Sequence, residues 1–218
     1  MQSLETAIEV LKHGGAIIYP LLALALAALV VMLDKALVYR RHARLPEPLR
    51  QLVETYGFDW AELDRQLTDL GPRNYFGRFF RVIMDNRNKP AWWVESRAGD
   101  EAQQIEKSLG RGMWVLDTVV TAAPLLGLLG TIFGMMQSFR LMGPDGLVNP
   151  SGVTAGVAEA LIATAVGLLI ALVALFGYNY LTRLQAQMLD EMERLGTRLV
   201  DHIRLDAQER GDDREVAP

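Results

Sequence analysis

The chain contains no cysteine among its 218 residues and only three histidines. Without cysteine, disulfides and thiolate chemistry are excluded, and His13, His42 and His202 occupy unrelated positions, so neither a metal site nor a cofactor is expected. The net charge is −4, and the basic residues are scattered among acidic ones, which gives no indication of nucleic-acid binding. No constellation of nucleophile, base and metal ligands is present, and we do not expect an enzyme.

Charged residues are missing from three long windows at residues 14–33, 118–139 and 160–182. As helices, all three windows are long enough to cross the hydrocarbon core of a bilayer, which is about 30 Å thick. The segments between them are strongly charged. The sequence therefore predicts an all-α integral membrane protein with three transmembrane helices, which we place at residues 14–38, 113–139 and 153–182.

The first window could instead belong to a cleaved secretory signal. A signal needs a basic segment before its apolar core, whereas here Glu5 and Glu9 stand against Lys12. A cluster that includes Lys35 and Arg40 follows the window directly and is typical of a stop-transfer signal. We therefore expect this segment to remain as a membrane anchor.

The positions of lysine and arginine predict the orientation. Of the 22 basic residues, only Lys12 and Arg140 lie outside the loop at 34–112 and the tail from residue 183. Because cytoplasmic segments are enriched in Lys and Arg, we expect these two parts to be cytoplasmic and the N-terminus to be external. The resulting organisation has an external amphipathic helix at 1–13, a cytoplasmic helical domain at 39–112, a short periplasmic loop at 140–152, and a cytoplasmic helix with a disordered tail at 183–218.

Apolar residues keep a helical spacing on the cytoplasmic side of the second and third spans. One series runs from Ala91 straight into the second span, and another runs from Leu184 to Ile203. Both spans are therefore expected to extend into the cytoplasm as long helices, whose apolar stripes favour self-association. Within the loop, Asp59 is a predicted N-cap.

Small residues form a stripe on each of the last two spans. Glycine weakens a helix in water by about 1 kcal/mol, but in lipid small residues let neighbouring helices approach closely. We therefore expect the two stripes to be helix-packing surfaces. Their members are Gly127, Gly130 and Gly134 in the second span, and Gly156, Ala160, Ala163 and Gly167 in the third.

Beside the first stripe, Asp117, Pro124, Thr131 and Ser138 recur every seven residues. A seven-residue repeat stays in line along a packed helix bundle, so Thr131 and Ser138 can face a common interior, either a tight contact or a pore. The alternative for each threonine is a hydroxyl bonded to a carbonyl of its own helix. Asp117 is a possible pore acid on the cytoplasmic side, although solvation at the surface or pairing with Arg111 is favoured.

Glu159 and Thr164 flank the stripe of the third span, about 140° apart on a helix. Ionisable residues inside spans are costly and usually functional. However, a glutamate near a helix N-terminus is also stabilised by the helix dipole, and spacing does not separate these two interpretations. No carboxylate lies near the middle of any span.

Three segments resemble the ExbB/TolQ/MotA proton-channel family. They are APLLGLLGTIFGMM at 123–136, AEALIATAVGLL at 158–169 and YPLLALALAALVVMLDK at 19–35. The three-span form is most similar to ExbB-type members and next to TolQ-type members, since MotA-type stators have four spans. The loop from Arg40 to Arg111 matches only loosely.

The resemblance implies a ring-forming homopentamer in the inner membrane of a Gram-negative cell. Its pore would enclose the single spans of an ExbD-like dimer, and proton flow would energise a TonB-like protein. The family's pore threonines match Thr131 and Thr164, and its third-span glutamate matches Glu159. A TolQ-like role in envelope maintenance and a passive membrane scaffold are the alternatives. A solute transporter is disfavoured, because the chain lacks an inverted repeat.

Overall fold

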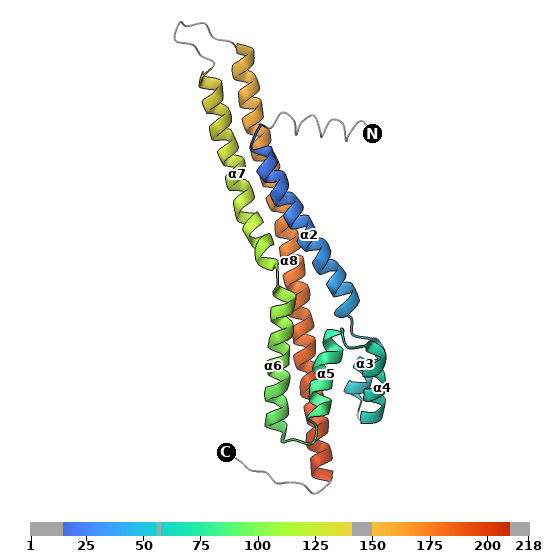
Figure 1. The fold of residues 1–218 in the computed structure, drawn as a ribbon. Helices are drawn as coiled ribbons and strands as arrows, with labels where there is room; N and C mark the ends of the chain where they lie inside the picture. Colours follow the sequence, from blue (N-terminus) through green and yellow to red (C-terminus); the bar gives the residue numbers. More distant parts are fainter. Residues whose placement is uncertain (1–14, 56–57, 141–149, 210–218) are drawn as a thin grey trace. The chain divides into compact units, whose positions relative to one another are not determined.

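The computed structural model describes residues 15–55, 58–140 and 150–209, and these residues form helices joined by short connections (Figure 1). The expected helix at 1–13, residues 141–149 of the expected loop and the expected tail from 210 lie outside the described residues. The helices are α2 (Ile18–His42), α3 (Glu47–Glu54), α4 (Trp60–Leu70), α5 (Tyr75–Asp85), α6 (Ala91–Gly110), α7 (Met113–Arg140) and α8 (Pro150–Glu209).

Three of these helices are long and apolar enough to cross a membrane, which confirms the predicted number of spans. They are α2, α7 and α8, the last over Gly152–Gln208. Helix α8 is one continuous helix of 60 residues, as its uninterrupted apolar spacing predicted. Gly196 does not interrupt it.

The expectation that a single helix runs from Ala91 through the second span is wrong. Helix α6 ends at Gly110 and α7 begins at Met113. Between them Gly112 has a φ of 85°, in the left-handed region that favours glycine and interrupts a right-handed helix. The apolar spacing continues across this point, so periodicity alone did not reveal the break.

The chain divides into two compact units. The first comprises Met1–Asp34 and Gly112–Tyr180, and the second Lys35–Arg111 and Leu181–Pro218. The first unit therefore holds most of α2, all of α7 and the first half of α8. The second holds α3 to α6 together with the ends of α2 and α8.

Small side chains make up much of the core of the first unit. Ala123, Ala160 and Ala174 are buried, whereas Leu125 and Leu161 are exposed. In water this arrangement would leave a large apolar surface unprotected, but lipid solvates large apolar side chains while small residues mediate helix contacts. The unit is thus built as a membrane bundle.

Large side chains form the core of the second unit. Phe80 and Ile83 of α5 are buried, as are Ile105 of α6 and Leu195 and Leu199 of α8. This pattern is typical of a water-soluble helical domain, in which burial of large apolar side chains is the main driving force.

Side-chain caps fix the helix ends in this unit. Asp59 accepts a hydrogen bond from the backbone nitrogen of Ala61 at 2.9 Å, so its predicted role as the N-cap of α4 is confirmed. Asn74 caps α5 in the same way, accepting from the nitrogen of Gly77 at 3.1 Å. Such caps satisfy backbone donors that the first turn of a helix leaves free.

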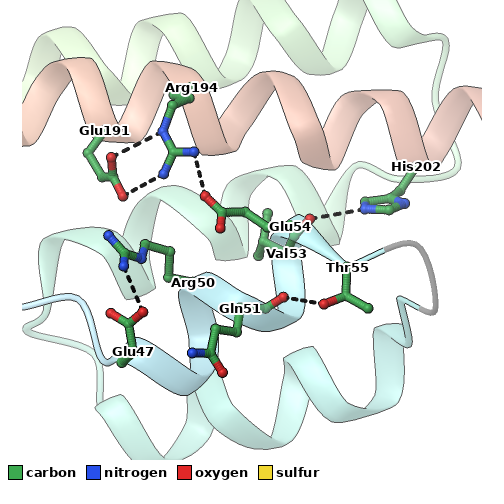
Figure 2. Close-up of polar contacts among 9 residues, drawn as sticks. All are labelled: Glu47, Arg50, Gln51, Val53, Glu54, Thr55, Glu191, Arg194 and His202. Carbon is green, nitrogen blue, oxygen red and sulfur yellow. Dashed lines mark hydrogen bonds and ion pairs between the residues drawn. The ribbon is translucent and has the colours of Figure 1, made fainter.

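Polar contacts attach α3 to α8 within the second unit (Figure 2). Arg194 of α8 forms ion pairs with Glu54 of α3 and with Glu191 of its own helix. His202 lies about two turns further along and contacts the carbonyl oxygen of Val53 through Nε2 at 3.1 Å. The short helix α3 is therefore held at its C-terminal end by two side chains of α8.

Candidate functional site

The backbones of α7 and α8 touch where the glycines of the two stripes meet. A Cβ atom added to Gly127 would lie 3.0 Å from both the Cα of Thr164 and the carbonyl oxygen of Ala163. One added to Gly167 would lie 2.5 Å from the carbonyl oxygen of Ala123. Because real Cβ atoms almost never come as close to backbone as 2.5 Å, an alanine at Gly167 would push the helices apart, and one at Gly127 would require the backbone of α8 to shift by a few tenths of an ångström.

The same contact continues toward the end of α7. A Cβ on Gly134 would lie 2.8 Å from that of Ala160, and one on Gly130 would lie 2.5 Å from that of Ala163. Across from them, a Cβ on Gly156 would overlap the Ser138 hydroxyl. The structure thus brings all the small residues singled out in the sequence into one α7–α8 contact.

Thr164 connects the two helices through its side chain. Its Oγ1 donates a hydrogen bond to the carbonyl oxygen of Gly127, at 3.0 Å. The sequence left open whether Thr164 bonds to a carbonyl of its own helix. Thr164 instead bonds to α7. Gly127 makes the interhelical bond possible, because the absence of a side chain there lets the two backbones come within reach.

The hydroxyl of Thr131, unlike that of Thr164, bonds within its own helix. Its Oγ1 donates to the carbonyl oxygen of Leu128 in its own helix, at 2.6 Å. The residue is half-buried, at the edge of the α7–α8 contact. Its hydroxyl oxygen keeps acceptor capacity that this bond does not use, so Thr131 can still accept a hydrogen bond from a group beside α7.

The seven-residue series of α7 does not lie in one environment. Asp117 is exposed, Pro124 and Thr131 are half-buried, and Ser138 is buried with 3% of its surface exposed. A straight α-helix turns by about 20° for each seven residues relative to an ideal heptad. The series therefore drifts around α7, from the exposed side into the contact with α8.

Ser138 is the last residue of this series and lies within the contact between α7 and α8. Its hydroxyl donates to the carbonyl oxygen of Gly134 at 2.9 Å and lies 3.4 Å from that of Val153 in α8. In the single chain, Ser138 therefore packs between helices, about 20° around α7 from the direction of Thr131. A pore-lining role for either residue stays a prediction.

Glu159 lies against Gly15, three residues before the start of α2. A Cβ on Gly15 would overlap Oε1 of Glu159, and Gly15 has a φ of 66°. The carbonyl oxygen of Gly15 accepts from the nitrogen of Ile18, the first residue of α2, at 3.2 Å. The carboxylate of α8 thus occupies the space that a side chain at position 15 would fill. The sequence gave no sign of this pairing, since the two residues are far apart along the chain.

Among the described residues, no group of three or more His, Cys, Asp or Glu side chains could hold a metal ion. The arrangement instead presents hydroxyls, a carboxylate and close backbones within three apolar helices. Such a site can relay or orient polar groups inside a membrane.

The fold and this site define an all-helical integral membrane protein. The model of the MotA/TolQ/ExbB proton channel family matches residues 72–194, from just before α5 into the second half of α8. This is more than half of the chain, and the protein therefore belongs to that family.

Relatives with curated names agree with this assignment. An ExbB-like biopolymer transport protein of Synechocystis sp. is 28% identical over 195 residues, which cover 88% of this chain and 76% of that protein. The biopolymer transport protein ExbB of Aquifex aeolicus is 41% identical over 80 residues, covering 37% of this chain and 54% of that protein. ExbB of Neisseria gonorrhoeae is 36% identical over 92 residues, which are 41% and 42% of the two chains. The protein is thus an ExbB-type member of a proton-channel family.

Proposed function

We propose that this chain is the ring-forming subunit of a proton-driven motor that energises a TonB-like protein for transport across an outer membrane. Five copies would surround the single spans of an ExbD-like dimer. The complex would lie in the inner membrane of a Gram-negative cell, with its N-terminus periplasmic and its C-terminus cytoplasmic.

The hydrogen bond between Thr164 and Gly127 is the observation that carries this proposal. It joins α7 and α8 through Thr164, which the resemblance matches to a pore threonine, and Thr131, the other matched threonine, lies on α7 four residues after Gly127. A hydroxyl can donate and accept without carrying charge. Such a pair would stabilise a passing carboxyl group or water without trapping a proton.

The chain needs a partner to complete a proton path. Residues 118–139 and 160–182 contain no acidic side chain, so the middle of the α7 and α8 spans holds no carboxylate that could carry a proton. A membrane aspartate from an ExbD-like span would supply one. Because one proton crossing 100 mV releases about 2.3 kcal/mol, several protons per cycle would be needed for a large mechanical step.

The burial of Ser138 favours an alternative function, in which the chain is a passive membrane scaffold. Ser138 is buried and its hydroxyl is satisfied by the backbone, as expected of a residue that serves packing alone. A TolQ-like subunit for envelope maintenance would use the same arrangement as an ExbB-like one, and partner identity would separate these two functions.

Proton flux into vesicles tests the proposal. Vesicles would hold the chain alone, or the chain co-purified with its ExbD-like partner, under an imposed potential. We expect flux only with both chains, and a loss of at least tenfold in Thr131→Val with its partner still bound. Thr118→Val serves as the control and should retain most of the flux, because Thr118 is an exposed threonine of α7 that also bonds to a carbonyl of its own helix, that of Trp114. Equal flux with and without the partner, or full flux in Thr131→Val, would overturn the coupled channel.

A further inference from the structure

The second unit contains a cavity of about 740 Å³ where the end of α2, the start of α3 and helix α4 come together. Three of the side chains that line it are arginines, Arg41, Arg44 and Arg65. Pro48 and Leu70 add apolar surface to the same cavity. A basic wall combined with apolar surface suits a ligand that has both an anionic and an apolar part.

The arginines do not all have internal partners. Arg65 pairs with Glu62 at 2.6 Å, and hydrogen bonds from Gln66 and Arg65 lower the pKa of the Glu62 carboxyl, so this pair stays ionised at neutral pH. Arg41 and Arg44 form no ion pair within the part of the chain that the structure describes. Two guanidinium groups are therefore available to an external anion.

Acidic groups only partly offset this charge. Glu62 and Asp69 are the acids that line the cavity, against three arginines, so the wall keeps a net positive charge. Helix α3 also begins here, without a side-chain cap at Pro46. Its positive dipole end adds to the attraction for an anion.

The cavity is held in shape by a buried polar side chain. Asn74 has 6% of its surface exposed, and its amide nitrogen donates to the carbonyl oxygen of Arg44 at 2.9 Å. Its oxygen caps α5, so Asn74 ties the backbone of Arg44 to the start of α5. The segment carrying Arg44 is therefore fixed before any ligand binds.

The sequence of α2 connects this cavity to the membrane. Within this one continuous helix, Arg41 follows Leu33, the last residue of the apolar run, by eight residues, or about 12 Å at 1.5 Å per residue. Basic clusters that directly follow a transmembrane helix attract anionic lipids, and a guanidinium matches a phosphate with two parallel hydrogen bonds.

We propose that this cavity binds the phosphate of an anionic phospholipid headgroup, with Arg41 and Arg44 as its principal ligands. The apolar residues Pro48 and Leu70 contact the glycerol end of the lipid. This inference rests on the membrane location of the chain and is independent of proton conduction, so it stands or falls separately from the proposed function.

Binding of short-chain lipids to the full chain in neutral detergent tests the site. The probes are dihexanoyl-phosphatidylglycerol, dihexanoyl-phosphatidylcholine and inorganic phosphate, each followed by the shift in thermal unfolding that a ligand of the folded state produces. We expect saturable binding of phosphatidylglycerol, and at least tenfold weaker binding of the other two. Inorganic phosphate binding as tightly as the lipid would show a free-anion site and overturn the lipid assignment.

The neighbouring Arg40 provides a matched control, because it is exposed on the same turn of α2 but does not line the cavity. Arg41→Gln with Arg44→Gln should weaken phosphatidylglycerol binding at least tenfold, whereas Arg40→Gln with Arg198→Gln should change it less than twofold. Equal losses in the two pairs would show diffuse attraction and overturn the proposal. Arg41→Lys keeps the charge but loses the two-pronged geometry, so a clear loss in this milder variant supports the site, and undiminished binding contradicts it.

Discussion

The hydroxyl of Thr164 in α8 donates a hydrogen bond to the carbonyl oxygen of Gly127 in α7, across a distance of 3.0 Å. This bond joins two helices where a Cβ on Gly127 would lie 3.0 Å from the backbone of α8. A residue matched to the family's pore therefore also holds the wall of the site together. Structural and conducting roles of Thr164 have to be separated by choosing variants that affect only one of them.

Thr164→Val should destabilise the first unit, because valine keeps the shape of threonine but cannot donate to Gly127. Interhelical hydrogen bonds in membranes contribute about 0.6–2 kcal/mol, and we expect a loss in this range. The measurement is the free energy of unfolding in detergent. Thr164→Ser retains the donor and should remain near the wild type. Equal stability of the valine and wild-type chains would contradict the role of this bond.

Much of this contact followed from the sequence, because its information is local. Small residues at helical spacing in two apolar segments can meet in only a few ways, and Gly127, Ala163 and Gly167 lie where that spacing placed them. The number of spans followed from the absence of charge, since lipid leaves few alternatives to a helix.

Other features depend on tertiary geometry and could not be predicted. The drift that buries Ser138 while Asp117 stays exposed depends on whether α7 coils around its neighbour or remains straight. The break at Gly112 and the pairing of Glu159 with Gly15 involve a single backbone angle and a contact between distant residues. Periodicity carries no information about either.

Gly127→Ala should destabilise the protein, because its new methyl group would lie 3.0 Å from backbone atoms of α8. Overpacking of this kind costs about 1–3 kcal/mol. Gly99→Ala in α6 is the matched control, since a Cβ there meets nothing within 4 Å. That variant should gain about 0.5–1 kcal/mol from helix propensity. Thermal unfolding of both chains compares them, and a neutral Gly127→Ala would show that α7 and α8 can separate at no cost.

Gly15→Ala should displace the carboxylate of Glu159, because the new methyl group would occupy the position of Oε1. In the reconstituted complex, we expect Gly15→Ala to reduce proton flux by a similar factor to Glu159→Gln. The double variant should be no worse than either single one, since both changes remove the same contact. Additive losses of flux would mean that the two residues act independently.

Gly71→Ala controls for the backbone strain in that experiment. Gly71 has a φ of 75°, similar to that of Gly15, but a Cβ there meets nothing within 4 Å. Because its φ of 75° and ψ of 165° lie in a region essentially restricted to glycine, Gly71→Ala should lower the free energy of unfolding by about 1–3 kcal/mol through strain alone and leave proton flux unchanged. A similar loss of flux in Gly71→Ala would assign the effect of Gly15→Ala to strain and not to Glu159.

The attachment of α3 to α8 should be weak and sensitive to salt. Hydrogen bonds with Glu191 and Glu54 raise the pKa of Arg194 above its usual value, so its charge persists at every physiological pH. The partners are nevertheless about half exposed, and exposed pairs contribute only about 0.2–1 kcal/mol. A double-mutant cycle of Arg194→Met and Glu54→Gln should give a coupling in this range at low salt and close to zero at 1 M salt.

Arg198 tests whether this coupling is specific. It is exposed one turn further along α8 and forms no ion pair within the ranges that the structure describes. The cycle of Arg198→Met with Glu54→Gln should therefore give no coupling at either salt concentration. If the two cycles agree, Glu54 responds to the general field of α8 and not to Arg194. His202 and the apolar core would then be left as the contacts that hold α3 in place.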